Sequence, residues 1–223
     1  MGDTSTFPYT PPPHGPLHYL HADAAVLVVD KPAGLLSVPG RGADKADCLA
    51  ARVQADYPEA RIVHRLDMET SGIMVLARDA DSHRALSIQF QQRQVSKRYV
   101  AVVDGRPAAE SGSIDLPLIT DWPNRPRQKV DFALGKPSLT HWRLLAYNAD
   151  DDSSRVALEP ETGRSHQLRV HLLAIGHPIL GDALYASPPL QRKARRLLLH
   201  AEFLAFRHPQ TGIAMEFSLK EPF

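Results

Sequence analysis

The chain has 223 residues, of which 43% are hydrophobic and 23% charged, which suits one globular domain with small appendages. A net charge of only +1 excludes a bulk polycation that coats nucleic acid, and the single cysteine, Cys48, excludes an internal disulfide and a multi-cysteine zinc site. Without a secretory signal or an apolar run of roughly 18 residues, we expect a protein of the cytoplasm that does not enter membranes.

Residues 1–18 are rich in proline and show no apolar periodicity, so we expect an extended or flexible tail outside the core. No repeat or later linker divides residues 19–223, which are therefore predicted to form one domain. Its first element is a buried strand at 25–29, stopped by a Lys-Pro pair. A helix follows, with Leu49, Val53 and Tyr57 on one face.

The remaining chain shows more strand patterns than helix patterns. A helix is predicted at 80–92, and another at 166–175 with Ser165 as its N-cap and Leu168, Leu172 and Ile175 on one face. Strands are predicted at 73–77, 97–103, 139–147, 154–159, 199–206 and 213–218. Because strands and helices do not alternate one for one, the pattern favours an α+β fold with a mostly antiparallel mixed sheet, flanked by helices and loops.

Several motifs that would indicate a cofactor, a nucleophilic serine or a metal site are absent from the sequence. No glycine-rich dinucleotide or P-loop motif occurs, and no Gly-x-Ser-x-Gly elbow is present. The eleven histidines never form a His-Glu-x-x-His pattern, and His166 and His171, five residues apart, miss a shared helix face. We therefore expect neither a cofactor nor a metal.

Local basic clusters are the only sequence feature that favours a polyanionic partner. They comprise Lys97-Arg98, the trio Arg125, Arg127 and Lys129, the segment from Arg164 to His171, and the segment 192–196. A charge run is more often a solvated face than a binding site, so these clusters alone do not establish RNA binding.

The segment 64–72, His-Arg-Leu-Asp-Met-Glu-Thr-Ser-Gly, places the carboxylate of Asp67 just before a predicted strand. Such a carboxylate can be held rigidly and still reach a pocket. The simpler alternative is that Asp67 caps a turn by accepting backbone N–H groups, and the chemistry of the segment alone favours that alternative.

The letters of this segment resemble the signature of the RluA family of pseudouridine synthases. Three further segments resemble family motifs in the same order: Lys31–Leu35, Lys97–Ala101 and Gly163–His171. The resemblance runs from about residue 20 to the end of the chain. It implies a pseudouridine synthase catalytic domain over 19–223 that isomerises uridine in structured RNA.

The implied reaction breaks the N1–C1′ bond of uridine, rotates the uracil and joins C5 to C1′. No cofactor or metal is needed, because the product is an isomer of the substrate. The resemblance makes Asp67 the catalytic residue. Asp67 acts either as a nucleophile, at C1′ or C6, or as a general base at C2′, and the sequence does not choose between them.

The resemblance gives two further residues catalytic roles. Arg169 becomes the ion-pair partner of Asp67, in place of a surface arginine on an amphipathic helix. A nearby cation lowers a carboxylate pKa by roughly 1–3 units. Tyr99 becomes the ring that stacks on the uracil, with a possible part in relaying the C5 proton, in place of an ordinary core aromatic.

Substrate binding is assigned in the same way. The target uridine must leave its stack, at a cost of a few kcal/mol, and the resemblance implies that Arg65 fills the space the base leaves. His64 and Leu168, in the matching segments, are also predicted to contact substrate. The cluster Arg125, Arg127 and Lys129 and the segment 192–196 are predicted to bind phosphates, which would make binding weaken steeply with salt.

Within the family, residues 121–130 are similar to those of a member that modifies both 23S ribosomal RNA and tRNA and has no S4 domain. We therefore expect RNA partners of both kinds, and a monomer. One alternative is a non-catalytic RNA-binding or ribosome-assembly factor, against which the set of Asp67, Tyr99 and Arg169 argues. A glycoside or nucleoside hydrolase would need a second carboxylate, for which Glu69 is the nearest candidate.

Overall fold

The protein is built on one large sheet, seen here in a computed structural model that describes residues 9–223. Its strand order is β1-β2-β4-β11-β5-β10-β9-β6, with β12 paired to β11 and β3 paired to β4. The strands are β1 (Tyr19–Ala22), β2 (Val26–Lys31), β3 (Arg61–Ile62), β4 (Ser71–Ala77), β5 (Ser96–Asp104), β6 (Ser111–Asp115), β9 (Leu139–Asn148), β10 (Ser153–Pro160), β11 (Leu199–Arg207) and β12 (Ala214–Ser218). Between described strands, β4 with β11 is the one parallel pair in this sheet, which confirms the predicted α+β class.

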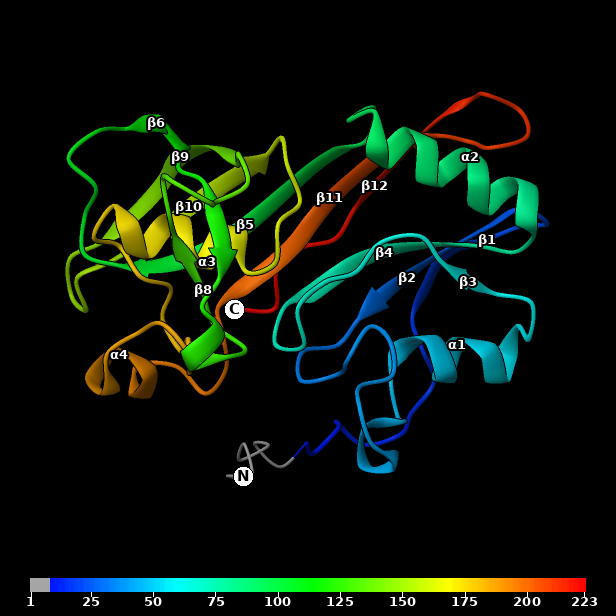
Figure 1. The fold of residues 1–223 in the computed structure, drawn as a ribbon, viewed down its shortest axis with the longest axis horizontal. Helices are drawn as coiled ribbons and strands as arrows, with labels where there is room; N and C mark the ends of the chain where they lie inside the picture. Colours follow the sequence, from blue (N-terminus) through cyan, green and yellow to red (C-terminus); the bar gives the residue numbers. More distant parts are fainter. Residues whose placement is uncertain (1–8) are drawn as a thin grey trace.

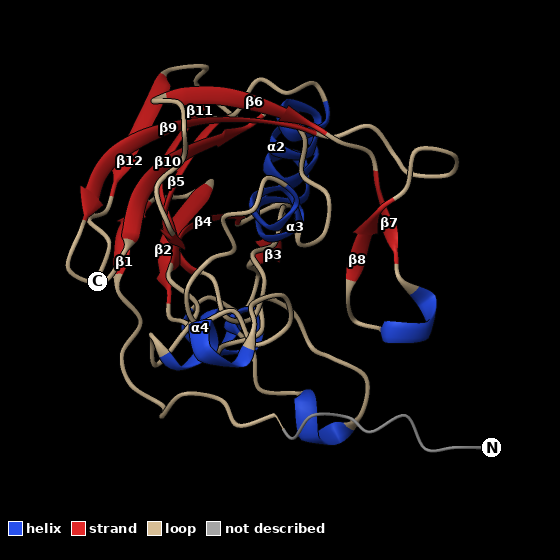
Figure 2. Ribbon diagram, turned by 90° about the vertical axis from the view of Figure 1, so that its left-hand side faces the viewer, coloured by secondary structure: helices blue, strands red, loops and turns tan. Residues whose placement is uncertain are grey.

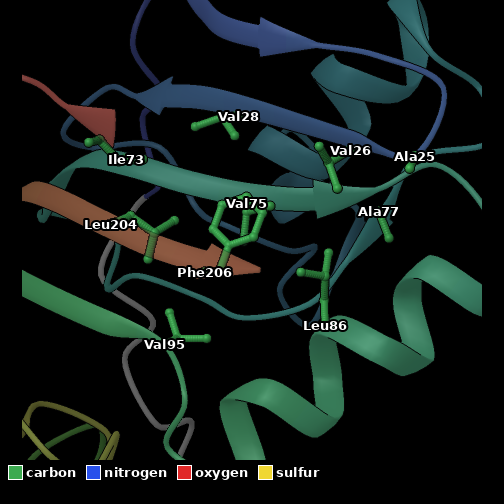
Figure 3. Close-up of a cluster of buried hydrophobic side chains, with 10 residues drawn as sticks. All are labelled: Ala25, Val26, Val28, Ile73, Val75, Ala77, Leu86, Val95, Leu204 and Phe206. Atoms are coloured by element: carbon green, nitrogen blue, oxygen red, sulfur yellow. The ribbon is translucent and has the colours of Figure 1, made fainter. Parts of the chain in front are cut away.

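Two helices cover opposite faces of the strands β2 and β4 (Figure 1). The helices of the protein are α1 (Leu49–Asp56), α2 (Ala80–Gln91), α3 (Gln167–Ala174) and α4 (Pro188–Arg192). Side chains alternate along a strand, so Val26 and Val28 pack toward α2, whereas Leu27 and Val29 pack toward α1. Figure 3 shows Leu86 reaching from α2 toward these strands. Truncating such a fully buried leucine to alanine costs about 2–5 kcal/mol.

The other half of the sheet is covered by α3, which packs Leu168 and Leu172 against β5 and β10. Tyr99 on β5 contacts this cluster and also the cluster beneath α1, so it stands where the two halves meet. The halves are joined by β4 and β11 at Gly72, where φ is +115° and a Cβ atom would overlap the backbone of Ala201. Glycine is therefore required for this close approach.

A separate hairpin stands beside the large sheet (Figure 2). It consists of β7 (Leu118–Thr120) and β8 (Gln128–Val130), joined through a short 3-10 helix, η2 (Trp122–Asn124). A second 3-10 helix, η1, covers Ala43–Lys45. The sequence pattern predicted the long elements but missed the short ones: β1, β3, β6, β7, β8 and α4.

The described part of the expected tail contacts the domain. Residues 1–8 lie outside the described residues, and 9–18 form no helix or strand. The Tyr9 hydroxyl donates to the Asp47 carbonyl at 2.9 Å, and the Arg52 guanidinium donates to the Pro12 carbonyl at 2.6 Å. Residues 9–18 therefore pack along the start of α1.

The start of α3 differs from the prediction. The N-cap is His166, not Ser165, and its backbone is left-handed with φ 55° and ψ 18°. A Ser165 cap was expected from side-chain chemistry, but no cap side chain bonds the first turn. Gln167 stabilises this end instead, because its amide accepts from Arg164 N at 3.0 Å and donates to the Leu139 carbonyl at 3.0 Å.

Candidate active site

Asp67 lies in the loop between β3 and β4, which is fixed on both sides of the carboxylate. The Ser37 hydroxyl donates to the Leu66 carbonyl at 2.7 Å and accepts from Leu66 N at 3.1 Å. On the other side, the Met68 carbonyl accepts from Gly34 N at 2.9 Å and from Lys31 Nζ at 2.9 Å. No backbone N–H of residues 9–223 donates to the Asp67 carboxylate, so it is not a turn cap.

Lys31 anchors this loop from beneath. It is fully buried, and its Nζ donates to the carbonyls of Pro32, Leu35 and Met68 at 2.9, 2.7 and 2.9 Å. Burial lowers the pKa of Lys31 to about 7, opposed by the nearby charges of Glu69 and Asp67. Three carbonyl acceptors require all three ammonium protons, so the geometry favours the charged form. The Lys-Pro pair that ends β2 thus positions the loop that carries Asp67.

Arg169 pairs with two carboxylates. Its Nη1 lies 3.5 Å from Asp67 Oδ2, as the family resemblance implied, and its Nε and Nη2 bind Asp182 at 2.8 and 2.6 Å. Arg169 is 5% exposed and Asp182 1%, whereas Asp67 is 21% exposed. The bidentate bond fixes the guanidinium plane, and Asp67 keeps oxygen surface free for a substrate.

Asp182 is itself held by the backbone N–H groups of Leu184 and Tyr185, at 2.9 and 3.1 Å. The same turn places the Tyr185 ring under Arg169, 5.0 Å from its guanidinium carbon. The buried acid and the ring together leave Arg169 little freedom to turn. The site therefore contains a chain of fixed groups that runs from Asp182 through Arg169 to Asp67.

The Tyr185 hydroxyl links the active site to the hairpin. It accepts from Gln128 N on β8 at 2.7 Å and lies 2.7 Å from His166 Nδ1. The tautomer of His166 decides which of these two groups donates the proton of their hydrogen bond. Burial lowers the pKa of His166, which favours the neutral form of the ring.

These groups surround a cavity of about 100 Å³ at the junction of the two halves. Asp67, Tyr99 and Arg169 line it together with Leu168 and Arg65. Burial and the charge of Asp67 raise the pKa of Tyr99, so its hydroxyl stays protonated. Ligand pockets typically measure about 300–1,000 Å³, so this cavity by itself is small. Arg65 is exposed at this cavity.

The structure places His64 outside the cavity. Its ring stacks on Phe90 with centroids 4.5 Å apart, and its Nε2 accepts from Val75 N at 3.1 Å. Burial lowers its pKa to about 3, helped by the charge of Lys97. In this position His64 supports β4, and a direct contact with substrate stays a prediction.

The cluster Arg125, Arg127 and Lys129 lies on the hairpin, away from the cavity lining. All three side chains are exposed. Arg125 stacks on Trp122 at 4.3 Å, and Lys129 lies 3.7 Å from Asp131. Three apolar side chains of the same region are also largely exposed: Trp122 at 64%, Phe132 at 79% and Leu134 at 74%. Cations interleaved with exposed aromatic rings suit phosphate contact and base stacking.

Sequence reasoning missed Asp182, Tyr185, Ser37 and the anchoring role of Lys31. Asp182 follows a glycine in a loop, and its partner Arg169 is thirteen residues away with no periodic relation. The only available signal was a lone acid in an otherwise apolar segment.

Two kinds of feature, a metal-binding cluster and a membrane-spanning helix, are absent from the described part of the chain. Among residues 9–223, no three His, Cys, Asp or Glu side chains gather where they could hold a metal ion. None of the described helices is long and apolar enough to cross a bilayer.

Comparison with known proteins identifies the family. A family described as RNA pseudouridylate synthase matches residues 25–174. The chain belongs to this family. It is 52% identical to "Dual-specificity RNA pseudouridine synthase RluA" of Escherichia coli (strain K12) over 96% of this chain and 98% of the relative, and 51% identical to its counterpart in Salmonella typhi over the same shares. The solved structure "Human RNA Pseudouridylate Synthase Domain Containing 1" matches with a TM-score of 0.79 and 29% identity, over 95% of this chain and 87% of that one.

The protein is thus an RNA pseudouridine synthase, as the resemblance of its motifs predicted, and it isomerises uridine in RNA. In this reaction the uracil changes its bond to C1′ from N1 to C5, the C5 proton departs to solvent, and N1 acquires a proton. The cavity offers one carboxylate beside a fixed cation and a protonated phenol. A carboxylate in such surroundings suits covalent or general-base chemistry.

Proposed function

We propose that this enzyme converts uridine to pseudouridine in two kinds of RNA, 23S ribosomal RNA and the anticodon stem-loop of tRNA. The curated relatives that match almost the whole chain carry the description "dual-specificity". The exposed hairpin with its cations and aromatic rings supports contact with structured RNA beyond the target base. A cytoplasmic location follows for an enzyme that meets both substrates.

Catalysis is assigned to Asp67, Tyr99 and Arg169. The observation that carries this assignment is the Arg169 guanidinium, which is held by Asp182 and lies 3.5 Å from the partly exposed carboxylate of Asp67. Asp67 attacks C1′ or C6, or removes the C2′ proton. Tyr99 stacks on the uracil, and its protonated hydroxyl is available to relay the C5 proton.

Substrate binding is assigned to the cavity rim and the hairpin. Arg65 fills the space that the flipped base leaves, and Leu168 forms an apolar wall of the cavity. Arg125, Arg127 and Lys129 bind phosphates. We further propose that residues 19–223 form a single catalytic domain that acts as a monomer, with residues 9–18 packed along it.

The experiment is tritium release from RNA labelled at uridine C5. That label reaches water only when C5 becomes the glycosidic carbon. Separate transcripts of 23S ribosomal RNA and tRNA are each incubated with the wild-type protein and with Asp67→Ala. We expect release from both RNAs by the wild type and none by the variant.

Each other outcome overturns a defined part of the proposal. Release from one RNA alone overturns dual specificity, and undiminished release by Asp67→Ala overturns the catalytic assignment. RNA binding without release from any transcript favours the non-catalytic binding factor. Asp56→Ala serves as the matched control, because Asp56 lies on α1 outside the cavity and accepts only the Tyr19 hydroxyl among described groups.

A further inference from the structure

A second, larger cavity adjoins the active site. Its volume is about 440 Å³, within the range of about 300–1,000 Å³ that is usual for ligand pockets. Lys97 and Pro160 line both cavities, so the two spaces meet at these residues. Lys97 precedes Tyr99 by two residues on β5, which places both side chains on one face of the strand about 7 Å apart.

Lys97 is a half-buried cation without a counter-ion. Its ammonium makes no hydrogen bond or ion pair with any of residues 9–223, and the one neighbouring charge that shifts its pKa is another cation, Arg93. Burial lowers the pKa of Lys97, the charge of Arg93 lowers it further, and no carboxylate opposes the shift. A cation in this position is stabilised by an anion supplied from outside the protein.

The other charged groups of the larger cavity are mostly paired. Arg98 donates to Glu202 at 2.5 Å, and its guanidinium carbon lies 4.9 Å from the centroid of the Phe203 ring. His141 lies 2.8 Å from Glu161. A fixed guanidinium on an aromatic ring forms a surface on which a nucleobase stacks. The wall therefore suits a base, and the unpaired cations suit the phosphate attached to it.

We propose that the larger cavity receives the nucleotide next to the target uridine, with its phosphodiester bound by Lys97 and its base against Phe203. This inference rests on the proposed function, since it extends the same RNA-binding site by one nucleotide. Continuity of the two cavities at Lys97 fits two consecutive nucleotides of one strand. Glu159, unpaired among the described residues, faces the same cavity as an acceptor for base N–H groups.

The test is a double-mutant cycle in which a charge is removed from the protein, from the RNA, or from both. Kd is measured for the tRNA anticodon stem-loop, unmodified or with a neutral methylphosphonate at each phosphate flanking the target uridine. Proteins are the wild type, Lys97→Met and Lys97→Arg. We expect Lys97→Met to bind about tenfold more weakly, with a salt slope smaller by about one, and Lys97→Arg to restore most of the affinity.

One methylphosphonate position should weaken the wild type by a similar factor and leave Lys97→Met unaffected. The proposal is overturned if the affinity losses from Lys97→Met and from the methylphosphonate add at every flanking phosphate. It is also overturned if Lys97→Met binds RNA as tightly as the wild type. Lys220→Met is the control, because Lys220 is exposed and lines neither cavity. Melting curves of all variants separate loss of affinity from loss of fold.

The base is tested with an abasic nucleotide at the position the cycle identifies. We expect the wild type to lose about tenfold in affinity and Phe203→Leu to lose nothing further. If the abasic nucleotide weakens binding equally in the wild type and in Phe203→Leu, the proposed stacking of the base on Phe203 is overturned. Binding does not require turnover, so a coupled response of Lys97 without tritium release contradicts the proposed function but supports the phosphate contact of Lys97.

Discussion

The active-site cavity and the β7–β8 hairpin differ in how their charged side chains are exposed and paired. In the cavity, Arg169 is 5% exposed and bound to Asp182 through two short hydrogen bonds. On the hairpin, the cluster Arg125, Arg127 and Lys129 is exposed and bonded weakly or not at all to described acids. Charges fixed before substrate arrives suit chemistry, because they need no reorganisation during the reaction. Exposed charges suit binding, because phosphates displace only water and ions.

The Tyr185 hydroxyl joins these two regions, through Gln128 N on one side and His166 on the other. The comparison therefore predicts that changes in the buried chain lower turnover and stability, that changes on the hairpin lower affinity, and that changes at the link affect affinity mildly.

The largest effect on stability is expected from Asp182→Asn. It removes one charge of a buried ion pair and releases Arg169, so we expect a loss of about 3 kcal/mol in the free energy of unfolding. Turnover in the tritium assay should fall at least about tenfold with little change in RNA affinity. Urea denaturation measures the stability. Asp81→Asn, which breaks an ion pair with 73% and 89% exposed partners, should cost almost nothing.

Neutralising the hairpin should produce the opposite signature. With Arg125, Arg127 and Lys129 all changed to Gln, we expect the slope of log K against log salt to shrink by about two to three units. Single-turnover release at saturating enzyme should stay near the wild-type rate. A control with Arg61, Arg84 and Lys220 changed to Gln keeps the net charge equal. An equal loss of slope in that control would show that bulk charge, not the hairpin, binds RNA.

Stability should depend on pH through His64. The folded protein holds this ring neutral down to a pKa of about 3, whereas the unfolded chain takes up a proton below about pH 6.5. The unfolded state then binds more protons, so the free energy of unfolding falls as pH drops from 6.5, by about 1–2 kcal/mol at pH 5. His64→Asn should flatten this part of the profile. An unchanged slope in the variant would place the titration on other histidines.

The smallest effect is expected from Tyr185→Phe. The ring under Arg169 remains, but Gln128 N and His166 lose their partner, a change of about 1 kcal/mol. We expect KM to rise about fivefold, as the hairpin detaches, while kcat stays nearly constant. Steady-state tritium release separates the two constants. Tyr147→Phe, which removes an exposed bond to Asp152, is the matched control.

Sequence patterns predicted what depends on local periodicity or on matched motifs. The helices around Leu49, Leu86 and Leu168 and the long strands were found, because each buries one regular face. The hairpin β7–β8 was missed, because strands of three residues are too short to show an alternation of apolar and polar side chains. The ion pair of Asp67 with Arg169 came from family resemblance, whereas Asp182 is buried by tertiary folding and its only signal in the sequence was a lone acid in an apolar segment.

The most direct test of the account is Asp67→Asn, which keeps the shape of the side chain and removes its charge. Two quantities are measured on the same RNA: Kd, and single-turnover release of tritium from C5. We expect release to fall by about a thousandfold or more with Kd nearly unchanged, because chemistry belongs to the buried chain and affinity to the exposed surfaces. Release within about tenfold of the wild-type rate would contradict the central claim that Asp67 carries the reaction.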